Sequence, residues 1–445
     1  MKNFINKSLL LALCSTAVIG CKPKFDEPAP SAGSADFSKF VTIGDGTAGG
    51  YADASLNRES QIAAFPNILA TQFKLVGGGE FAQPLVEEGK SYGFENNKAN
   101  SKYDLHYKTF CDGKTELYPE PTYTISTGDI ISFTIPTPPP YNNLAAQGAK
   151  LIYINKTPPW KSTSATYWQK ISTGSSSTML KDALAQSPTF VCINAGTVDV
   201  FRFAKSGGNQ DNGDDDFITP ANEFRDSLYS ILKAFKAKNA NVKGVITNII
   251  DVNSFPYFTY IKYDGLILSE SQAAALNTFY SGQFSFHAGR NAYVIADPAA
   301  TNGKRQIKKG EFVLIETPQD SLRCYKLGSE LPIRRRWVLD ETEVNTINTT
   351  VANYNAILKA AADAYGYAYV DGNSNIKDVV KGTQFQGIKY TSEMIVGNQF
   401  SVDGLNISPF GQAILANNCI VEINKKYGST IPFYDATKAR GVMFH

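Results

Sequence analysis

Apolar, β-branched runs alternate along the chain with stretches in which apolar residues recur at helical spacing. The runs predict strands at 40–43, 150–154, 189–193, 242–250 and 367–370. The stretches predict helices at 59–73, 180–185, 221–238, 340–364 and 409–427. Pro66 is expected to interrupt the first helix, and Gly428 to end the last. Strands alternating with helices are typical of a parallel sheet covered on both faces, so an α/β protein is predicted.

Two long stretches separate these predicted elements, from about residue 76 to 140 and from about 251 to 338. Connections in α/β proteins usually span a few residues, so both stretches are expected to be insertions that form a cap or subdomain. The predicted domain therefore runs from residue 38 to 432 with two large insertions, and residues 433–445 form a C-terminal tail.

The N-terminus has the pattern of an export signal. Two lysines precede a short apolar run, and Val18-Ile19-Gly20-Cys21 resembles a bacterial lipobox. Residues 1–20 are therefore predicted to be a lipoprotein signal peptide, with Cys21 acylated and the protein anchored to a membrane through that lipid. An ordinary cleaved signal peptide with an incidental cysteine is the alternative. Residues 21–37 are rich in Pro, Ser, Gly and Ala and are predicted to be a flexible tether.

The charge balance excludes one class of partner. Removal of residues 1–20 takes away Lys2 and Lys7 and leaves 41 basic against 41 acidic side chains. A near-neutral chain argues against a broad nucleic-acid-binding surface, so no nucleic acid is expected as a partner.

Four cysteines remain once Cys14 leaves with the signal and Cys21 is acylated. Cys192 lies in a predicted strand and Cys419 in a predicted helix, so both are expected to be buried thiols. Cys111 and Cys324 lie in loop-rich segments, where they could pair in an oxidising compartment or stay free. The spacings suggest no metal site, and no cofactor is expected.

Short motifs near the predicted strand ends carry a family resemblance. Gly44-Asp45-Gly46-Thr47 follows the first strand, and further matches occur at 49–53, 65–70, 142–144, 148–150, 199–200 and 400–404. Their order resembles that of the SGNH/GDSL hydrolase superfamily, in particular its lipoprotein members in Bacteroidetes. The resemblance extends from about residue 40 to 432 and implies a flavodoxin-like three-layer sandwich around a parallel sheet.

The resemblance also assigns the residues of a catalytic site, and three of them are replaced. Gly46 stands where the family has its nucleophilic serine, Val198 where an asparagine amide completes the oxyanion hole, and Asn406 where histidine is the general base. The oxyanion-hole glycine, Gly148, and the aspartate that orients the base, Asp403, are retained. These five positions are therefore interpreted as a vestigial site in which no catalytic residue is expected.

Three polar residues of the same motifs are possible ligand contacts: Asp45, Thr47 and Asp199. The alternative for the aspartates is turn and helix-cap chemistry, which is the favoured interpretation. The aromatic run at 255–260 is open to two interpretations, a sugar-stacking platform or core packing, and packing is favoured.

The leading hypothesis is a non-catalytic, lipid-anchored protein of a Bacteroidetes outer membrane, on the cell surface or on the periplasmic face. It would act as a binding or accessory subunit of an outer-membrane protein assembly for uptake, secretion or barrel insertion. A glycan-binding surface lipoprotein is one alternative. The other is an active esterase or acetylesterase with a shifted site, in which Thr47 replaces the serine.

Overall fold

A four-stranded parallel sheet forms the centre of the molecule in a computed structural model, which describes residues 29–95, 98–158, 164–208 and 216–441. The sheet has the order β1-β8-β9-β16. Its strands are β1 (Phe40–Gly44), β8 (Phe190–Asn194), β9 (Lys243–Thr247) and β16 (Ala368–Val370). All neighbouring pairs are parallel, and β1 and β8 are buried along their whole length. Such apolar strands are typical of a sheet that is covered on both faces.

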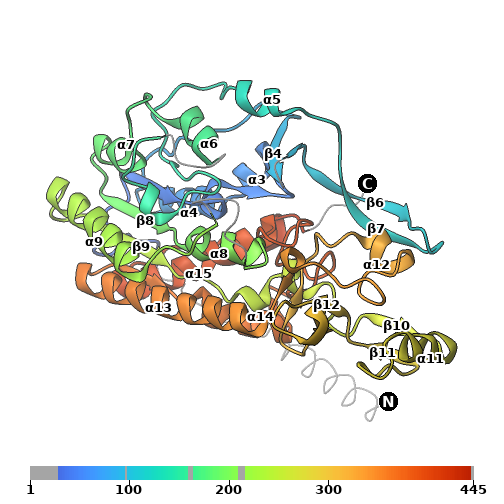
Figure 1. The fold of residues 1–445 in the computed structure, drawn as a ribbon. Coiled ribbons are helices and arrows are strands. Elements are labelled where there is room, and N and C mark those ends of the chain that lie inside the picture. The colour runs from blue at the N-terminus through green and yellow to red at the C-terminus, as the bar shows by residue number, and fades with distance from the viewer. Residues whose placement is uncertain (1–28, 96–97, 159–163, 209–215, 442–445) are drawn as a thin grey trace, which may run out of the picture.

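Helices cover both faces of the sheet (Figure 1). One face carries α4 (Phe65–Lys74) and α15 (Pro409–Tyr427), and the other carries α7 (Met179–Ala185), α9 (Ala221–Lys238) and α13 (Glu341–Tyr365). On the first face, Phe73 of α4 and Tyr427 of α15 both pack against the ring of Phe190 in β8. On the second, Phe224 of α9 stacks on Tyr354 of α13, with ring centroids 4.0 Å apart. The predicted α/β class is therefore confirmed.

The remaining helices of the body are short. They are α2 (Gly46–Gly49), α3 (Arg58–Ile62), α6 (Ser164–Ile171), α8 (Thr197–Lys205) and α14 (Gly372–Lys381). The predicted break near Pro66 is confirmed, because α3 ends at Ile62 and α4 begins at Phe65 with the proline in its first turn. Gly428 ends α15 in a left-handed conformation, also as predicted.

One predicted strand is wrong. Residues 150–154 contain a buried 3₁₀-helix, Leu151–Tyr153, instead of a strand. A short apolar run does not distinguish a buried strand from a buried helical turn. Next to β1 there is instead a single parallel bridge, between Thr42 and Asn143.

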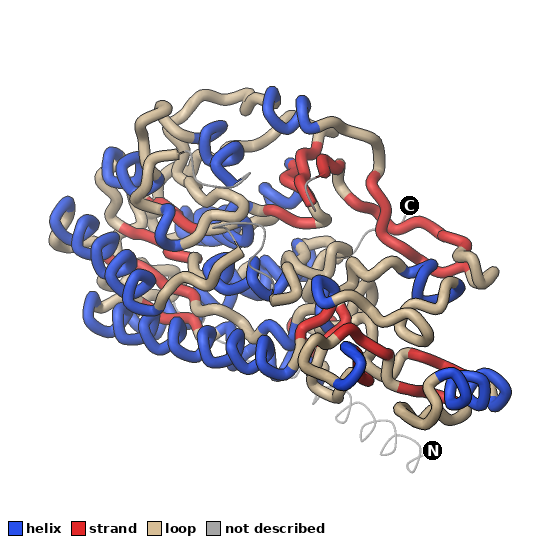
Figure 2. The backbone as a smooth tube through the Cα atoms, in the orientation of Figure 1, coloured by secondary structure: helices blue, strands red, loops and turns tan. Residues whose placement is uncertain are grey.

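The two long insertions contain most of the small strands (Figure 2). Within 76–140 lie β4 (Ser91–Glu95), β5 (Lys98–Asn100), β6 (Tyr103–Thr109), β7 (Thr115–Pro121) and α5 (Thr127–Ser132). Strands β4 and β5 extend a small antiparallel sheet that begins with β2 (Tyr51–Ala52) and β3 (Ser55–Asn57). Within 251–338 lie α10 (Pro256–Thr259), β10 (Leu266–Leu268), α11 (Glu270–Phe279), β11 (Gly289–Asn291), β12 (Val294–Ala296), β13 (Lys304–Gln306), β14 (Phe312–Val313), α12 (Gln319–Cys324) and the start of β15 (Val338–Leu339).

The second insertion has an apolar core of its own. Buried side chains between Ile261 and Val338 form a cluster separate from the main core. The two insertions are joined to each other by a disulfide between Cys111 and Cys324, the pair that the sequence left open. Beside it the guanidinium of Arg323 lies over the ring of Phe110 and binds the carboxylate of Glu116 at 2.6 Å. We call this disulfide-linked pair, β6–β7 with α12, the insertion arm. Cys192 and Cys419 are buried free thiols, as predicted.

The predicted tether is wrong from residue 29 onward. Ser34 donates its backbone N–H to Tyr427, and the Phe37 ring stacks on Phe73 with centroids 4.0 Å apart. The tail from residue 433 also contacts the body, since Arg440 pairs with Asp53 at 3.2 Å. Residues 1–28 lie outside the described part, and with them the signal peptide, Cys21 and its predicted acylation. Within the described ranges, no helix is both long and apolar enough to cross a membrane.

The last small elements belong to the segment between α14 and α15. Strands β17 (Thr383–Phe385) and β18 (Ile388–Tyr390) form an antiparallel pair just after α14. The residues that follow lead into the loop of Asp403 and Asn406, which returns to the carboxyl edge of the parallel sheet before α15 begins.

Candidate functional site

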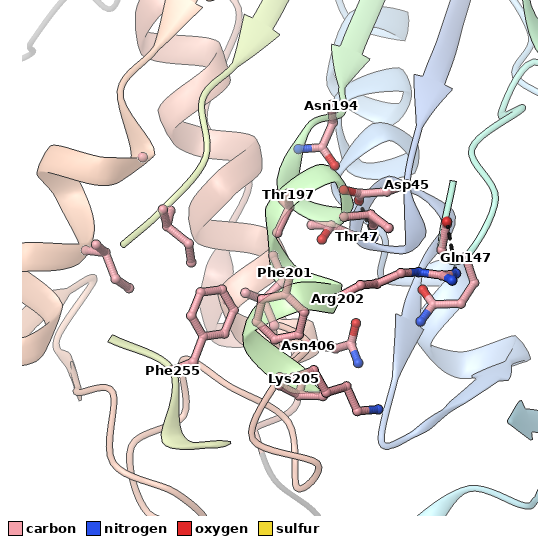
Figure 3. A pocket seen from close by; sticks show the side chains of 18 of the residues that line it. Asp45, Thr47, Gln147, Asn194, Thr197, Phe201, Arg202, Lys205, Phe255 and Asn406 are labelled. Carbon is pink, nitrogen blue, oxygen red and sulfur yellow. Dashed lines mark hydrogen bonds between the residues drawn. The ribbon is translucent and has the colours of Figure 1, made fainter. Parts of the chain in front are cut away.

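A cleft of about 1060 Å³ opens above the carboxyl ends of the parallel strands (Figure 3). Each strand contributes the residue at its end or just beyond: Asp45 after β1, Asn194 in β8, Thr247 in β9 and Gly372 after β16. This edge is where open α/β sheets bind ligands, because loops from several strands converge there. The cleft is at the upper end of the size of small-molecule sites, which is about 300–1,000 Å³.

The turn after β1 positions Asp45 as a helix cap. Its carboxylate accepts a hydrogen bond from the Thr47 backbone N–H at 3.0 Å, and its backbone carbonyl accepts one from Gly49. These bonds start the single-turn helix α2, which Gly50 ends in a left-handed conformation. The turn is therefore built as the sequence suggests, with Gly46 as its first helical residue.

The position of Gly46 is closed off from the cleft by Gln147. A Cβ atom at residue 46 would overlap Oε1 of Gln147 and would stand 2.8 Å from its Cδ. Gly46 lines a separate space of only about 20 Å³, whereas Gln147 lines both that space and the cleft. The side chain of Gln147 thus fills the place that a side chain at residue 46 would need.

The structure brings three of the five predicted vestigial residues to one cleft. Gly148, Val198 and Asn406 all line it. The carbonyl of Gly148 accepts a hydrogen bond from the Arg202 guanidinium at 3.3 Å (Figure 3). Valine has no hydrogen-bond donor in its side chain, so the side chain of residue 198 offers nothing to an oxyanion. Gly46 and Asp403 are not among the lining residues.

Asp403 is engaged by its own loop and by the turn at residue 54. One carboxylate oxygen accepts from the backbone N–H groups of Leu405 and Asn406, both at 2.8 Å. The other accepts from the Ala54 N–H at 2.7 Å and from the Asn406 side-chain amide at 2.9 Å. Ala54 has a φ of 59°, a conformation that needs such support. Asp403 therefore stabilises this junction and orients the amide of Asn406.

Asp199 is also fully engaged and does not line the cleft. Its carboxylate accepts from the backbone N–H of Leu151 and from the hydroxyl of Thr219, both at 2.7 Å. Burial raises the pKa of Asp199 to about 6, and these two hydrogen bonds oppose the shift. The cap and turn interpretation therefore holds for Asp45, whose carboxylate caps α2, and is wrong for Asp199, which binds Leu151 and Thr219 from two distant segments. Thr47 lines the cleft, and its side chain forms a hydrogen bond with Asp45.

Asp45 resembles Asp199 in its raised pKa but differs in the hydrogen bonding of its carboxyl group. Burial raises the pKa of Asp45 to about 7, and the hydrogen bonds from Thr47 oppose this shift. Its second oxygen, Oδ2, is buried and has no hydrogen-bond partner among the described residues. The same is true of Oδ1 of Asn194, which lies beside it because Gly44 and Asn194 are register partners in β1 and β8.

The described residues that line the cleft include no Ser–His pair of the kind used in acyl transfer by a serine mechanism. Of the three histidines, His106 lies in β6 and His287 between α11 and β11, both in the insertions, and His445 lies outside the described residues. No histidine or cysteine is among the described residues that line the cleft. Within the same described ranges, no group of three His, Cys, Asp or Glu residues is arranged to hold a metal ion.

Aromatic rings form part of the cleft wall. Phe201 of α8 and Phe255 both line it, with ring centroids 5.3 Å apart (Figure 3). Tyr257 and Phe258 are buried beneath them, as the packing interpretation of the run at 255–260 predicts. Only Phe255 of that run lines the cleft.

Several lining residues were not predicted from the sequence. Gln147 directly precedes the retained Gly148, and Asn194 directly follows a predicted strand. Both positions could therefore have been predicted to lie near the site. Gln399 and Phe201 carry no comparable signal, because their approach to the cleft depends on how distant segments pack.

The fold and this cleft define an α/β protein with a ligand-sized cleft at the carboxyl edge of its parallel sheet. Neither a protein-family model nor a curated protein sequence matches the chain. Among solved structures, the chain is similar to one from Parabacteroides merdae ATCC 43184, described as "a putative GDSL-like lipase". The identity is 10% and the TM-score 0.36, over 90% of this chain and 99% of that one. At this distance the likeness carries no argument about activity.

Proposed function

We propose that the chain is a catalytically inactive relative of the SGNH/GDSL hydrolases that serves as a binding or accessory subunit of an outer-membrane protein assembly. The observation that carries the loss of catalysis is the side chain of Gln147, which fills the space of a side chain at residue 46. A glycine at the nucleophile position cannot form an acyl-enzyme, and an attacking group there would first require the Gln147 side chain to move.

Two further positions support this proposal. The side chain of Val198 cannot donate to an oxyanion, and loss of one such donor typically lowers kcat by about a hundredfold or more. Asn406 cannot take up a proton near neutral pH, and its amide is held by Asp403. The loss of the nucleophile, the oxyanion donor and the general base together favours a non-catalytic role.

The insertion arm supports a role in binding a protein partner. Seven of the thirteen large, exposed apolar side chains in the described part of the chain lie in the two insertions: Tyr107, Tyr123, Ile131, Ile267, Phe279, Tyr325 and Leu331. Two of them lie on the insertion arm, Tyr107 in β6 and Tyr325 directly after α12, and exposed apolar side chains there favour an interaction site. Lipidation at Cys21 would hold this arm near other membrane proteins.

Hydrolysis of p-nitrophenyl acetate and p-nitrophenyl butyrate tests the absence of catalysis. We expect wild-type protein to give no turnover above a buffer blank. Turnover by the wild type that is lost in both Thr47→Ala and Asp403→Ala would establish an esterase with a shifted site and overturn the proposal.

Purification of the tagged, full-length protein from its own membrane in mild detergent tests the accessory role. We expect outer-membrane proteins to copurify and the Tyr107→Ser/Tyr325→Ser variant to lose them. Ile62→Ser is the matched control, because Ile62 is an exposed apolar residue outside both insertions. A protein that runs alone, or partners that are retained by the double variant, would contradict the role of the arm.

A further inference from the structure

Three buried side chains that line the cleft have oxygen atoms without a hydrogen-bond partner among the described residues: Asp45 Oδ2, Asn194 Oδ1 and Gln399 Oε1. Each side chain is more than nine-tenths buried, with exposed fractions of 2%, 7% and 8%. A buried acceptor without a partner costs about 1–3 kcal/mol, so folded proteins rarely retain one without a use.

The other polar atoms of Asp45 and Asn194 have partners. The Asn194 amide donates to the hydroxyl of Thr247 at 2.6 Å, and its oxygen has none among the described residues. Asp45 Oδ1 already accepts from Thr47, which leaves Oδ2. Two of these side chains come from the ends of the adjacent strands β1 and β8, and a complementary ligand must offer hydrogen-bonding groups to them.

The charges around the cleft restrict the kind of ligand that can bind there. Its lining carries the cationic side chains of Lys98, Arg202, Lys205 and Arg336 and the acidic side chains of Asp45, Asp216 and Glu316. An ammonium ligand would meet the cations and an anionic ligand the carboxylates. A neutral hydroxyl group donates to a carboxylate or amide oxygen without either cost.

The rest of the lining fits a ligand with many hydroxyl groups. The side-chain amides of Gln147 and Asn406 reach the same space, and an amide both donates and accepts, as a hydroxyl does (Figure 3). The rings of Phe201 and Phe255 offer apolar surface for the C–H face of a sugar ring. The volume of about 1060 Å³ is large for a single small molecule.

We propose that this cleft binds a neutral oligosaccharide, whose hydroxyl groups form hydrogen bonds with Asp45, Asn194 and Gln399 while a sugar ring packs on Phe201 and Phe255. This assignment rests on the proposed non-catalytic function and names the ligand class of the same site.

Calorimetric titration of the mature protein tests the assignment, with cellotetraose, xylotetraose, maltotetraose and mannotetraose as neutral probes and tetragalacturonate as an anionic one. We expect at least one neutral probe to bind, and Asn194→Leu to weaken that binding at least tenfold. Asn239→Leu is the matched control, because Asn239 caps the far end of α9 and does not line the cleft. Both variants are checked for folding by circular dichroism, and Phe201→Leu serves as a second test if Asn194→Leu does not fold.

Three results would overturn the assignment: binding of the anionic probe alone, binding that neither Asn194→Leu nor Phe201→Leu weakens, or no binding of any probe. Ester turnover, measured on the same samples, separates the two proposals. Turnover by the wild type would contradict the proposed non-catalytic function. Absence of both turnover and sugar binding would contradict only the assignment of an oligosaccharide as the ligand.

Discussion

The side chain of Gln147 occupies the space that a Cβ atom at Gly46 would enter. Gly46 has an ordinary helical backbone, so a larger residue there would require the Gln147 side chain to move and would not strain the backbone. The glycine at residue 46 and the position of the Gln147 side chain are thus one structural feature. On the proposal that this turn has lost its nucleophile, a serine at residue 46 alone would not rebuild it.

Gly46→Ser is expected to destabilise the protein without conferring activity. Its Cβ overlaps the Gln147 amide and stands 3.3 Å from Cβ of Tyr51, and overpacking of this kind costs about 1–3 kcal/mol. Gly46→Ser/Gln147→Ala should recover most of this loss, since the overlapping atoms are removed. Gly174→Ser is the control, because a Cβ at residue 174 meets no atom within 4 Å.

Urea denaturation of these variants measures the free energies of unfolding, and p-nitrophenyl acetate measures activity. Equal stability of Gly46→Ser and Gly174→Ser would show that Gln147 does not hold the space. Ester turnover by the double variant would show that neither Val198 nor Asn406 limits the chemistry.

The stability of the protein should fall as pH rises from about 4 to 7, in part because of Asp45. Burial raises the pKa of Asp45 from its ordinary 3.8 to about 7 in the folded state. Between these values the folded state binds more protons than the unfolded state, so the free energy of unfolding decreases with pH. Each pKa unit corresponds to about 1.4 kcal/mol, which limits this contribution to about 4 kcal/mol.

Asp45→Asn should make that pH dependence shallower, because the amide oxygen still accepts from Thr47 and no proton is taken up. Asp199, with a pKa of about 6, contributes to the pH dependence of the free energy of unfolding between about pH 4 and 6 in both the wild type and the variant. The free energies of unfolding at pH 5 and pH 8 give the comparison. The same difference between the two pH values in variant and wild type would contradict the raised pKa of Asp45.

Phe37→Ala should destabilise the protein strongly, although its segment has the composition of a linker. The ring is 2% exposed and packs 4.0 Å from Phe73 and 4.8 Å from Phe190, centroid to centroid. Truncation of a buried phenylalanine costs about 3–5 kcal/mol. Phe433→Ala, at a residue 55% exposed, should cost less than about 0.5 kcal/mol by the same denaturation assay. Similar values for both variants would restore the tether interpretation of residue 37.

The sequence was sufficient to predict some elements of the fold and not others. Helices α9 and α15 have the predicted bounds, since their apolar spacing and end signals are strong. Residues 29–37 were misjudged because Pro, Ser, Gly and Ala say little about a single buried ring. The run 150–154 was misjudged because burial alone favours neither strand nor helix.

The candidate site divides in a similar way. Family motifs indicated Gly46, Gly148, Val198 and Asn406, because each lies in a short local pattern. Two features could not be predicted from the sequence: the Gln147 side chain beside Gly46, and the unpaired oxygens of Asn194 and Gln399. These features depend on which atoms of distant segments meet in the folded chain.

Reduction of the Cys111–Cys324 disulfide should lower thermal stability without unfolding the protein. The bond closes a loop with a sequence separation of 213 residues, for which chain entropy gives an upper limit of about 5 kcal/mol. Arg323 still binds Glu116 and covers Phe110 after reduction, so the insertion arm keeps a non-covalent junction. Dithiothreitol should therefore lower the Tm of the wild type and leave that of Cys111→Ser/Cys324→Ser unchanged. A Tm that is equal in the wild type and the double variant, with or without dithiothreitol, would mean that this bond does not stabilise the fold.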